Sequence, residues 1–350
     1  MREESTQFFR HLLEAPGPAG DERAPARVWR TYAEAFAEVH ADALGSSFAT
    51  VNPSGSPHLA VFGHIDEIGL VITHVDDEGF LWFDAVGGWD AQVLVGQRIR
   101  ILGRHGPVAG VVGKKAIHLI ERDDRDKASR IRDLWIDIGA DGGEDARRHV
   151  RPGDLAVLEQ PVLALGETRL AARAIDNRAG AFVALEAARL YAEQGAGCRF
   201  TAVASVQEET SFAGASTGAF SAQPDVAVAV DVTHTTDYPE SEKRREGDVK
   251  LAGGPSLARG AGVHPAVFDL LVEVAEAEGM AYQVESAGGS TGTDADAVHR
   301  SRGGVPTAVV SVPNRYMHSP SEIVDLRDLE AAARLVAAFA RRLERVPALS

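Results

Sequence analysis

The stretch LAVFGHIDEIG at residues 59–69 sets the expected architecture of the chain. It begins with an uninterrupted apolar run at residues 59–62, which has the length and character of a buried strand. Two polar residues, His64 and Asp66, follow almost at once. Because ligands of open α/β sheets bind beyond the carboxyl ends of the strands, a functional site is expected at this junction.

The character of the sequence changes directly after this stretch. From about residue 68 to 165 the apolar segments are brief, and turn clusters such as Asp76-Asp77-Glu78-Gly79 separate them. A segment with many short strands and frequent turns is typical of a small barrel or sandwich. We therefore expect residues 68–165 to form a β-rich domain of their own.

Helix and strand patterns alternate on both sides of this insert. Apolar residues recur at helical intervals at Val28, Tyr32, Phe36 and Val39, with Asp21 as the expected N-cap. Beyond the insert, strands are predicted at residues 200–206, 226–230 and 307–312, and the last helix is predicted to begin near Asp325. The pattern predicts a discontinuous α/β domain formed by residues 1–67 and 166–350.

Composition excludes several classes of protein. The 350 residues include 36 Lys and Arg against 51 Asp and Glu, which gives a formal net charge of −15. This acidic balance argues against a nucleic-acid partner, because phosphates require clustered basic residues. No window approaches the ~18 apolar residues of a membrane span. A lone cysteine, Cys198, cannot form an intramolecular disulfide, which favours the cytoplasm as the location.

Polar residues follow several separate strand predictions, at the point where each strand ends. These residues are His64, Asp66, Glu208, Glu209, Asp231 and His318. Asp176 lies just before the predicted helix that contains Phe182 and can reach the same edge. Taken singly, each has an ordinary interpretation as a surface histidine, a turn-forming aspartate or a solvated glutamate. Their convergence on one edge of a sheet is hard to attribute to composition and instead predicts a functional site there.

The segments that carry these residues resemble the M42 family of co-catalytic metallo-aminopeptidases. The matching segments are EAPGP (14–18), GHIDEIG (63–69), VGGWD (86–90), IDNRAG (175–180), VQEE (206–209), DVTH (231–234) and RYMHSP (315–320). They cover essentially the whole chain in order. The resemblance implies a mixed-sheet α/β zinc-peptidase catalytic domain with an inserted small β-barrel-like domain. It also implies homo-oligomers, commonly dodecamers, whose active sites face an interior chamber.

Carried over residue by residue, the resemblance implies two divalent metal ions per subunit. One ion would bind His64, Asp176 and Asp231, and the other would bind Asp176, Glu209 and His318, with Asp176 bridging the two. Imidazole and carboxylate ligands suit zinc, cobalt or manganese better than calcium, and zinc is the expected ion. The resemblance further implies a cis peptide bond between Asp176 and Asn177.

Two more residues are expected to act beside the ions. Since the family pattern assigns Glu209 to a metal, Glu208 is predicted to be the general base. Asp66 is expected to accept a hydrogen bond from the His64 imidazole and so to orient it. The implied reaction removes N-terminal residues from short peptides with a free N-terminus, with a hydroxide shared by the ions as the nucleophile.

Three alternative functions use some of the same residues. A related di-metal carboxypeptidase or deacylase shares the ligand set but does not need a free substrate amine. A glycoside hydrolase needs two carboxyl groups separated by ~5–5.5 or ~6.5–9.5 Å, and it would leave the histidines without a role. A non-catalytic scaffold would tolerate the loss of a ligand, yet every expected position is filled. The preferred N-terminal residue of the substrate is not predicted from the sequence.

Overall fold

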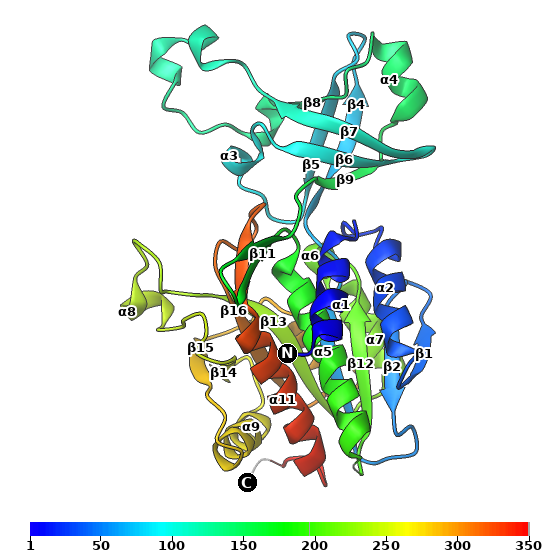
Figure 1. Cartoon of the computed structure of the whole chain (residues 1–350), viewed down its shortest axis with the longest axis vertical. Helices are drawn as coiled ribbons and strands as arrows, with labels where there is room; N and C mark the ends of the chain where they lie inside the picture. The colour runs from blue at the N-terminus through cyan, green and yellow to red at the C-terminus, as the bar shows by residue number, and fades with distance from the viewer. Residues whose placement is uncertain (196, 349–350) are drawn as a thin grey trace.

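An eight-stranded mixed sheet and a closed six-stranded barrel make up the protein (Figure 1). The computed structural model describes residues 1–195 and 197–348. The chain passes from the sheet to the barrel between β3 (His58–His64) and β4 (Gly69–Val75), and it leaves the barrel after β9 (Leu155–Leu158). The barrel therefore lies at one end of the α/β body, beside the carboxyl end of β3.

The centre of the large sheet is parallel and its edges are antiparallel. The strand order is β1 (Glu38–Ala41), β2 (Ser47–Val51), β12 (Arg199–Ser205), β3, β13 (Val226–His234), β16 (Thr307–Asn314), β14 (Ser256–Gly260) and β15 (Gln283–Ala287). Strands β12, β3, β13 and β16 run parallel, whereas β2 and β14 pair antiparallel to their inner neighbours. The central strands are almost wholly buried, which explains their continuous apolar sequences.

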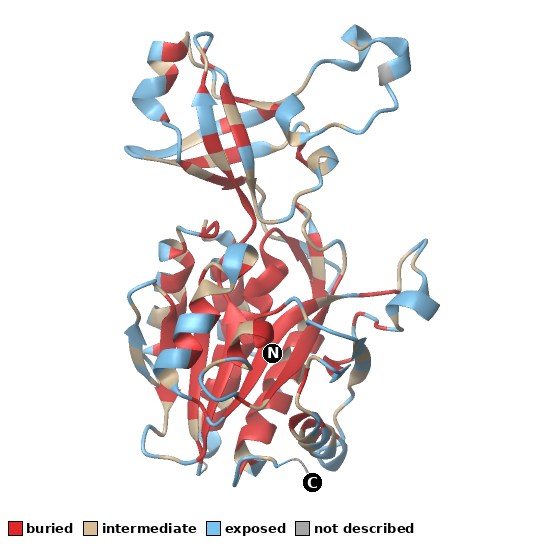
Figure 2. Ribbon diagram, turned by 180° about the vertical axis from the view of Figure 1, so that it is seen from behind, coloured by how far each residue is buried: buried red, intermediate tan, exposed pale blue. Residues whose placement is uncertain are grey.

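Helices cover both faces of this sheet and enclose two separate cores. One face packs against α1 (Glu3–Glu14), α2 (Arg23–Ala33), α5 (Ile175–Gln194), α9 (Pro265–Ala277) and α11 (Leu326–Arg342). The other face packs against α7 (Ala213–Ala222) and α10 (Ala295–Val298). Figure 2 shows the sheet and α5 as the most continuously buried part of the molecule. Helix α5 is buried on nearly all sides because it lies between the sheet and other helices.

The barrel has its own hydrophobic core. Its closed order is β4, β5 (Leu81–Val86), β8 (Trp135–Asp137), β7 (Gly106–Gly113), β6 (Arg98–Gly103) and β9. Inward-facing residues such as Leu70, Ile72, Ile99, Ile101 and Ile136 are buried, while their neighbours along each strand are more exposed. This alternation is what a small barrel filled by its own side chains requires.

A buried ion-pair network holds the crossing between the two bodies. Glu67, which directly follows the site stretch, pairs with Arg173 and Arg178, and all three side chains are buried. Arg178 also donates to the backbone carbonyls of Leu12 and Ala15. Because buried charges are tolerated only when paired and hydrogen-bonded, this network fixes the path of the crossing segment.

The α/β fold with an inserted barrel that the sequence predicts is confirmed. The N-terminal helix prediction is wrong in part, because α2 ends at Ala33 and Val39 lies in the edge strand β1. The residue at the N-cap position is Glu22, and the carboxylate of Asp21 pairs with Arg23 instead. The domain boundaries near residues 67 and 165 stay predictions. No helix in residues 1–195 or 197–348 combines the length and apolar character of a membrane span.

Candidate metal centre

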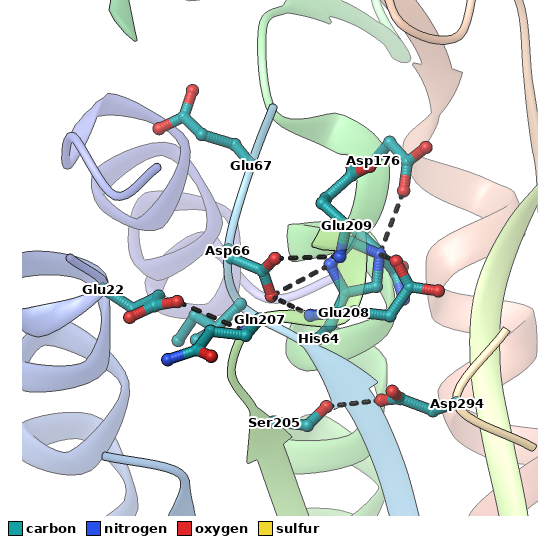
Figure 3. Close-up of polar contacts among 12 residues, drawn as sticks. Glu22, His64, Asp66, Glu67, Asp176, Ser205, Gln207, Glu208, Glu209 and Asp294 are labelled. Atoms are coloured by element: carbon teal, nitrogen blue, oxygen red, sulfur yellow. Dashed lines mark hydrogen bonds and ion pairs between the residues drawn. The ribbon is translucent and has the colours of Figure 1, made fainter. Parts of the chain in front are cut away.

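The carboxyl end of the central strands brings together all of the predicted site residues. Figure 3 shows His64, Asp66, Asp176, Glu208 and Glu209 gathered there. His64 ends β3 and pairs in register with Ser205 at the end of β12. Asp231 lies in β13, one strand further along the sheet. Glu208 and Glu209 begin the short helix α6 (Glu208–Ser211), Asp176 stands at the start of α5, and His318 follows β16.

The Asp176 carboxylate lies between two imidazole rings. Its Oδ1 is 3.2 Å from Nε2 of His64, and its Oδ2 is 3.2 Å from Nε2 of His318. The predicted cis peptide bond between Asp176 and Asn177 is present. One carboxylate thus offers a separate oxygen to each histidine, which is the arrangement that a bridging ligand between two ions needs.

The remaining donors divide between the two histidines. His64 Nε2 is 3.6 Å from Glu208 Oε2 and 3.9 Å from Asp231 Oδ1. His318 Nε2 is 3.6 Å from Glu209 Oε2. Donor atoms of His64, Glu208 and Asp231 lie within 4.8 Å of one another, and so do those of His64, Asp176 and Glu209. Distances alone therefore admit Glu208 either as a ligand or as a base.

Asp66 supports the backbone of both glutamates. Its two carboxylate oxygens accept hydrogen bonds from the backbone N–H groups of Glu208 and Glu209, each at 3.1 Å. Its Oδ1 is 3.5 Å from His64 Nδ1, which is longer than an ordinary hydrogen bond. The predicted orientation of His64 by Asp66 stays a prediction, and the structure adds the anchoring of α6 as a second contribution.

The carboxylates of the cluster have no lysine or arginine partner among the described residues. Within residues 1–195 and 197–348, no lysine or arginine nitrogen lies within 4.0 Å of the carboxylates of Asp66, Asp176, Glu208, Glu209 or Asp231. In the same part of the chain, Nδ1 of His64 and Oε1 of Glu209 are buried without a hydrogen-bond partner. Uncompensated carboxylates beside histidines fit divalent cations, which would supply the missing positive charge.

The pKa shifts in the metal-free protein follow from this crowding. Burial raises the pKa of Glu208 to about 9, and Asp294 and Glu209 add to the rise. Burial and the neighbouring Asp176 carboxylate also raise the pKa of Glu209 and of Asp231. Burial alone would raise the pKa of Asp176, but hydrogen bonds with His318 and His64 lower it overall. Of these four carboxyl groups, Asp176 is the one whose pKa falls overall, because the two histidines stabilise its anion.

One residue that holds the site was missed by the sequence analysis. Glu322, in β17 (Glu322–Asp325), accepts hydrogen bonds from the Asp176 N–H at 2.8 Å and from the His318 N–H at 2.9 Å. It is buried because β17 pairs with β11 (Arg169–Ala172), which leads into Asp176. Burial and Asp176 raise its pKa. A glutamate four residues after His318 is the only sequence signal, and it is weak without the strand pairing.

Two further buried acids border the site. Glu22 accepts hydrogen bonds from the N–H groups of Gly20 at 2.7 Å and of Gln207 at 3.2 Å, and burial raises its pKa to about 7. Asp294 accepts a hydrogen bond from Ser205, and burial raises its pKa to about 6. Glu22 therefore fixes the turn that immediately precedes Glu208.

A buried set of histidines and carboxylates at the carboxyl end of a mixed sheet is typical of metal-dependent hydrolases. Comparison with known proteins assigns the class. A model of the M42 glutamyl aminopeptidase family matches residues 45–335, and the chain belongs to this family. Members of the family are aminopeptidases, so the protein is an enzyme that hydrolyses peptide bonds.

The relatives match the chain along nearly its whole length. A lysyl aminopeptidase of Pyrococcus furiosus is 33% identical over 343 residues, which are 97% of each chain. The crystal structure of a TET aminopeptidase from a marine sediment archaeon of the Thaumarchaeota superimposes with a TM-score of 0.93 at 33% identity and covers 97% of each chain. The TET1 peptidase of Pyrococcus horikoshii, which can assemble into a tetrahedron or a large octahedral shell, has a TM-score of 0.86 at 31% identity, with 97% and 100% of the chains covered.

Proposed function

We propose that the protein is a co-catalytic aminopeptidase that uses two divalent metal ions per subunit, with zinc preferred over cobalt or manganese. The observation that supports two ions is the position of the Asp176 carboxylate, with one oxygen toward His64 and the other toward His318. A carboxylate shared in this way brings two cations to one substrate bond. The proposed substrates are short peptides with a free N-terminus.

The ligands would divide as the resemblance implies. His64 and Asp231 would hold one ion, Glu209 and His318 the other, and Asp176 would contact both. When bound, the two ions would lower the pKa of the attacking water and polarise the scissile carbonyl. This division leaves Glu208 free of metal, although its carboxylate stays within 3.6 Å of His64 Nε2.

Glu208 would move the protons of the reaction. Its backbone N–H is held by Asp66, and its buried carboxylate lies 3.6 Å from His64 Nε2, beside the proposed ions. It would accept a proton from the attacking water and later pass it to the departing amine. Asp66 would act through α6, because it fixes the backbone of both Glu208 and Glu209.

A panel of fluorogenic aminoacyl amides, tested with zinc, cobalt and manganese, examines this function. We expect hydrolysis of at least one free-amine substrate, loss of activity after chelation and recovery on addition of metal. The N-acetylated form of the same substrate is the matched control and should resist cleavage. Cleavage of the acetylated form would favour a deacylase or carboxypeptidase, and reducing sugars released from soluble cellulose would favour a glycoside hydrolase.

We also propose that the chain forms a cytoplasmic homo-oligomer, with a dodecamer as the expected assembly. The support is the similarity to the Pyrococcus horikoshii peptidase that assembles into closed shells. At −15 charges per chain the subunits repel one another at long range, so the contacts must be specific. Light scattering at low and high salt tests this proposal, and a 37.2 kDa monomer under both conditions would contradict it.

A further inference from the structure

The barrel reaches into the metal centre through one loop. Residues 87–90 connect β5 to α3 (Ala91–Leu94) and lie against the His318 side of the site. A Cβ atom built on Gly88 would lie 3.1 Å from Nδ1 and 3.3 Å from Cε1 of the His318 ring. The backbone at Gly88 is therefore packed directly on this imidazole.

The preceding glycine makes a similar approach to the other ligand expected on this side. A Cβ on Gly87 would lie 3.3 Å from Oε2 of Glu209 and 2.5 Å from Cγ2 of Ile68. Gly87 also has a φ of +79°, a conformation that favours glycine. A side chain at Gly87 would clash with Ile68, and one at Gly88 would press on the His318 ring. Both glycines lie beside Glu209 and His318, the two donors that would hold the same ion.

The loop is fixed to the barrel and not to the sheet. Trp89 donates from Nε1 to the backbone carbonyl of Gly69 at 2.8 Å, and its ring packs against the barrel core. Asp90 caps α3 by accepting from the N–H of Gln92 at 2.9 Å. The position of Gly87 and Gly88 is consequently set by the barrel.

His318 needs such support because little else surrounds it. Its side chain is 35% exposed and its backbone φ is +58°, whereas the His64 side chain is 2% exposed and belongs to a strand. Nε2 of His318 is 3.2 Å from Oδ2 of Asp176, and a Cβ atom on Gly88 would lie 3.1 Å from Nδ1 on the other edge of the ring. The Nε2 edge of the ring thus faces Asp176 and the Nδ1 edge faces Gly88.

We propose that the Gly87–Gly88 segment of the barrel is a positioning element for one of the two metal ions. It seats the His318 ring and the Glu209 carboxylate, while the pair formed by His64 and Asp231 does not depend on the barrel. This proposal rests on the proposed two-metal function. Contacts that orient a ligand without touching the metal commonly change metal affinity by ~10–100-fold.

The test is the release of zinc from the full-length assembled enzyme at increasing chelator concentration. In Gly88→Ala the added methyl group displaces the His318 ring, so one of the two ions should be released at ~10–100-fold lower chelator concentration. Release of the other ion, the melting temperature and the assembly should match the unmodified enzyme. Gly303→Ala is the matched control, since no atom lies within 4 Å of the added Cβ and the change should have no effect.

Two further variants identify the ion and guard against misfolding. Trp89→Phe keeps an aromatic ring at this position but removes the N–H that donates to the Gly69 carbonyl. It should weaken binding of the same ion to a smaller extent. In a Glu209→Gln background, which already weakens that ion, Gly88→Ala should leave release of the remaining ion unchanged. If the added Gly88→Ala change alters that release, the barrel does not act on one ion selectively.

The outcomes separate this proposal from the one on which it rests. If both Gly88→Ala and Trp89→Phe retain two ions with the affinity of the unmodified enzyme, the positioning role is wrong. If both ions weaken equally, the selectivity is wrong. If the unmodified enzyme releases only one ion per subunit, the two-metal function itself fails, and the selective role fails with it.

Discussion

The two halves of the proposed metal centre are built in different ways. His64 and Asp231 come from adjacent central strands, and their side chains are 2% and 8% exposed. His318 and Glu209 come from a loop and a short helix, and their side chains are 35% and 6% exposed, so His318 is the exposed member of the site. The first half is fixed by strand register, whereas the second depends on Glu322 and on the barrel. A single site therefore combines a rigid half with one that responds to the rest of the chain.

Removal of the carboxylate that joins the halves should have the largest effect. In Asp176→Asn the amide offers one oxygen and no charge, so neither ion keeps its shared ligand. We expect weakened binding of both ions and a fall in kcat/KM of ~10³-fold or more. Metal analysis and steady-state kinetics check this, with Asp84→Asn on the barrel as the control. Retention of two tightly bound ions would show that Asp176 does not bridge.

The neighbouring glutamates distinguish a base from a ligand. Glu208→Gln should retain both ions and the assembly but lose ~10²–10⁴-fold in kcat, because a glutamine cannot accept the proton. Glu209→Gln should instead weaken binding of the ion held with His318, since Oε2 of Glu209 faces His318. Metal content and kcat of both variants give the answer. If Glu208→Gln loses an ion while Glu209→Gln retains both, Glu208 is the ligand and Glu209 is the base.

Glu322→Gln should weaken binding of the ion at His318 and Glu209 more than binding of the ion at His64 and Asp231. The carboxylate accepts from the N–H groups of both Asp176 and His318, and a glutamine has only one oxygen to accept with. The loss of one bond should lower the affinity for the His318 ion by ~10–100-fold. Zinc release against chelator measures this, and Glu273→Gln on the exposed side of α9 is the control. Equal weakening of both ions would indicate that Glu322 acts mainly through Asp176.

The smallest effect on the proposed metal centre is expected at Glu22, which lies outside both halves and affects the stability of the fold. Its pKa is raised from 4.5 to about 7 by burial, so the folded state binds this proton more tightly than the unfolded state. The stabilisation is present below pH 4.5 and is lost as the pH rises through 7, a change of up to ~3 kcal/mol. Glu22→Gln cannot ionise and should melt higher than the unmodified enzyme at pH 8 but not at pH 5. An equal difference at both pH values would contradict this.

Continuous apolar sequences made the central strands predictable, because strands buried on both faces need them. β12, β13 and β16 lie where the sequence predicts strands, and the candidate site residues follow or flank such strands. The edge strands were not predicted, since β1 is mostly exposed and its Val39 continued a helical spacing. Glu322 and the approach of Gly88 to His318 were also missed. The first depends on the pairing of β17 with β11, and the second on the packing of a barrel loop against His318; periodicity records neither of these long-range contacts.

The buried crossing at Glu67 has a consequence for protein engineering. The segment that leads into the barrel begins within three residues of His64, and Arg173 and Arg178 anchor it to the start of α5, which carries Asp176. A truncated enzyme made by excising the barrel would have to cut and rejoin the chain inside this network. Such a minimal version would keep the sheet but would lose the anchor of the crossing segment together with the glycine loop beside His318. The barrel is therefore not a module that can be transplanted or deleted without rebuilding the site.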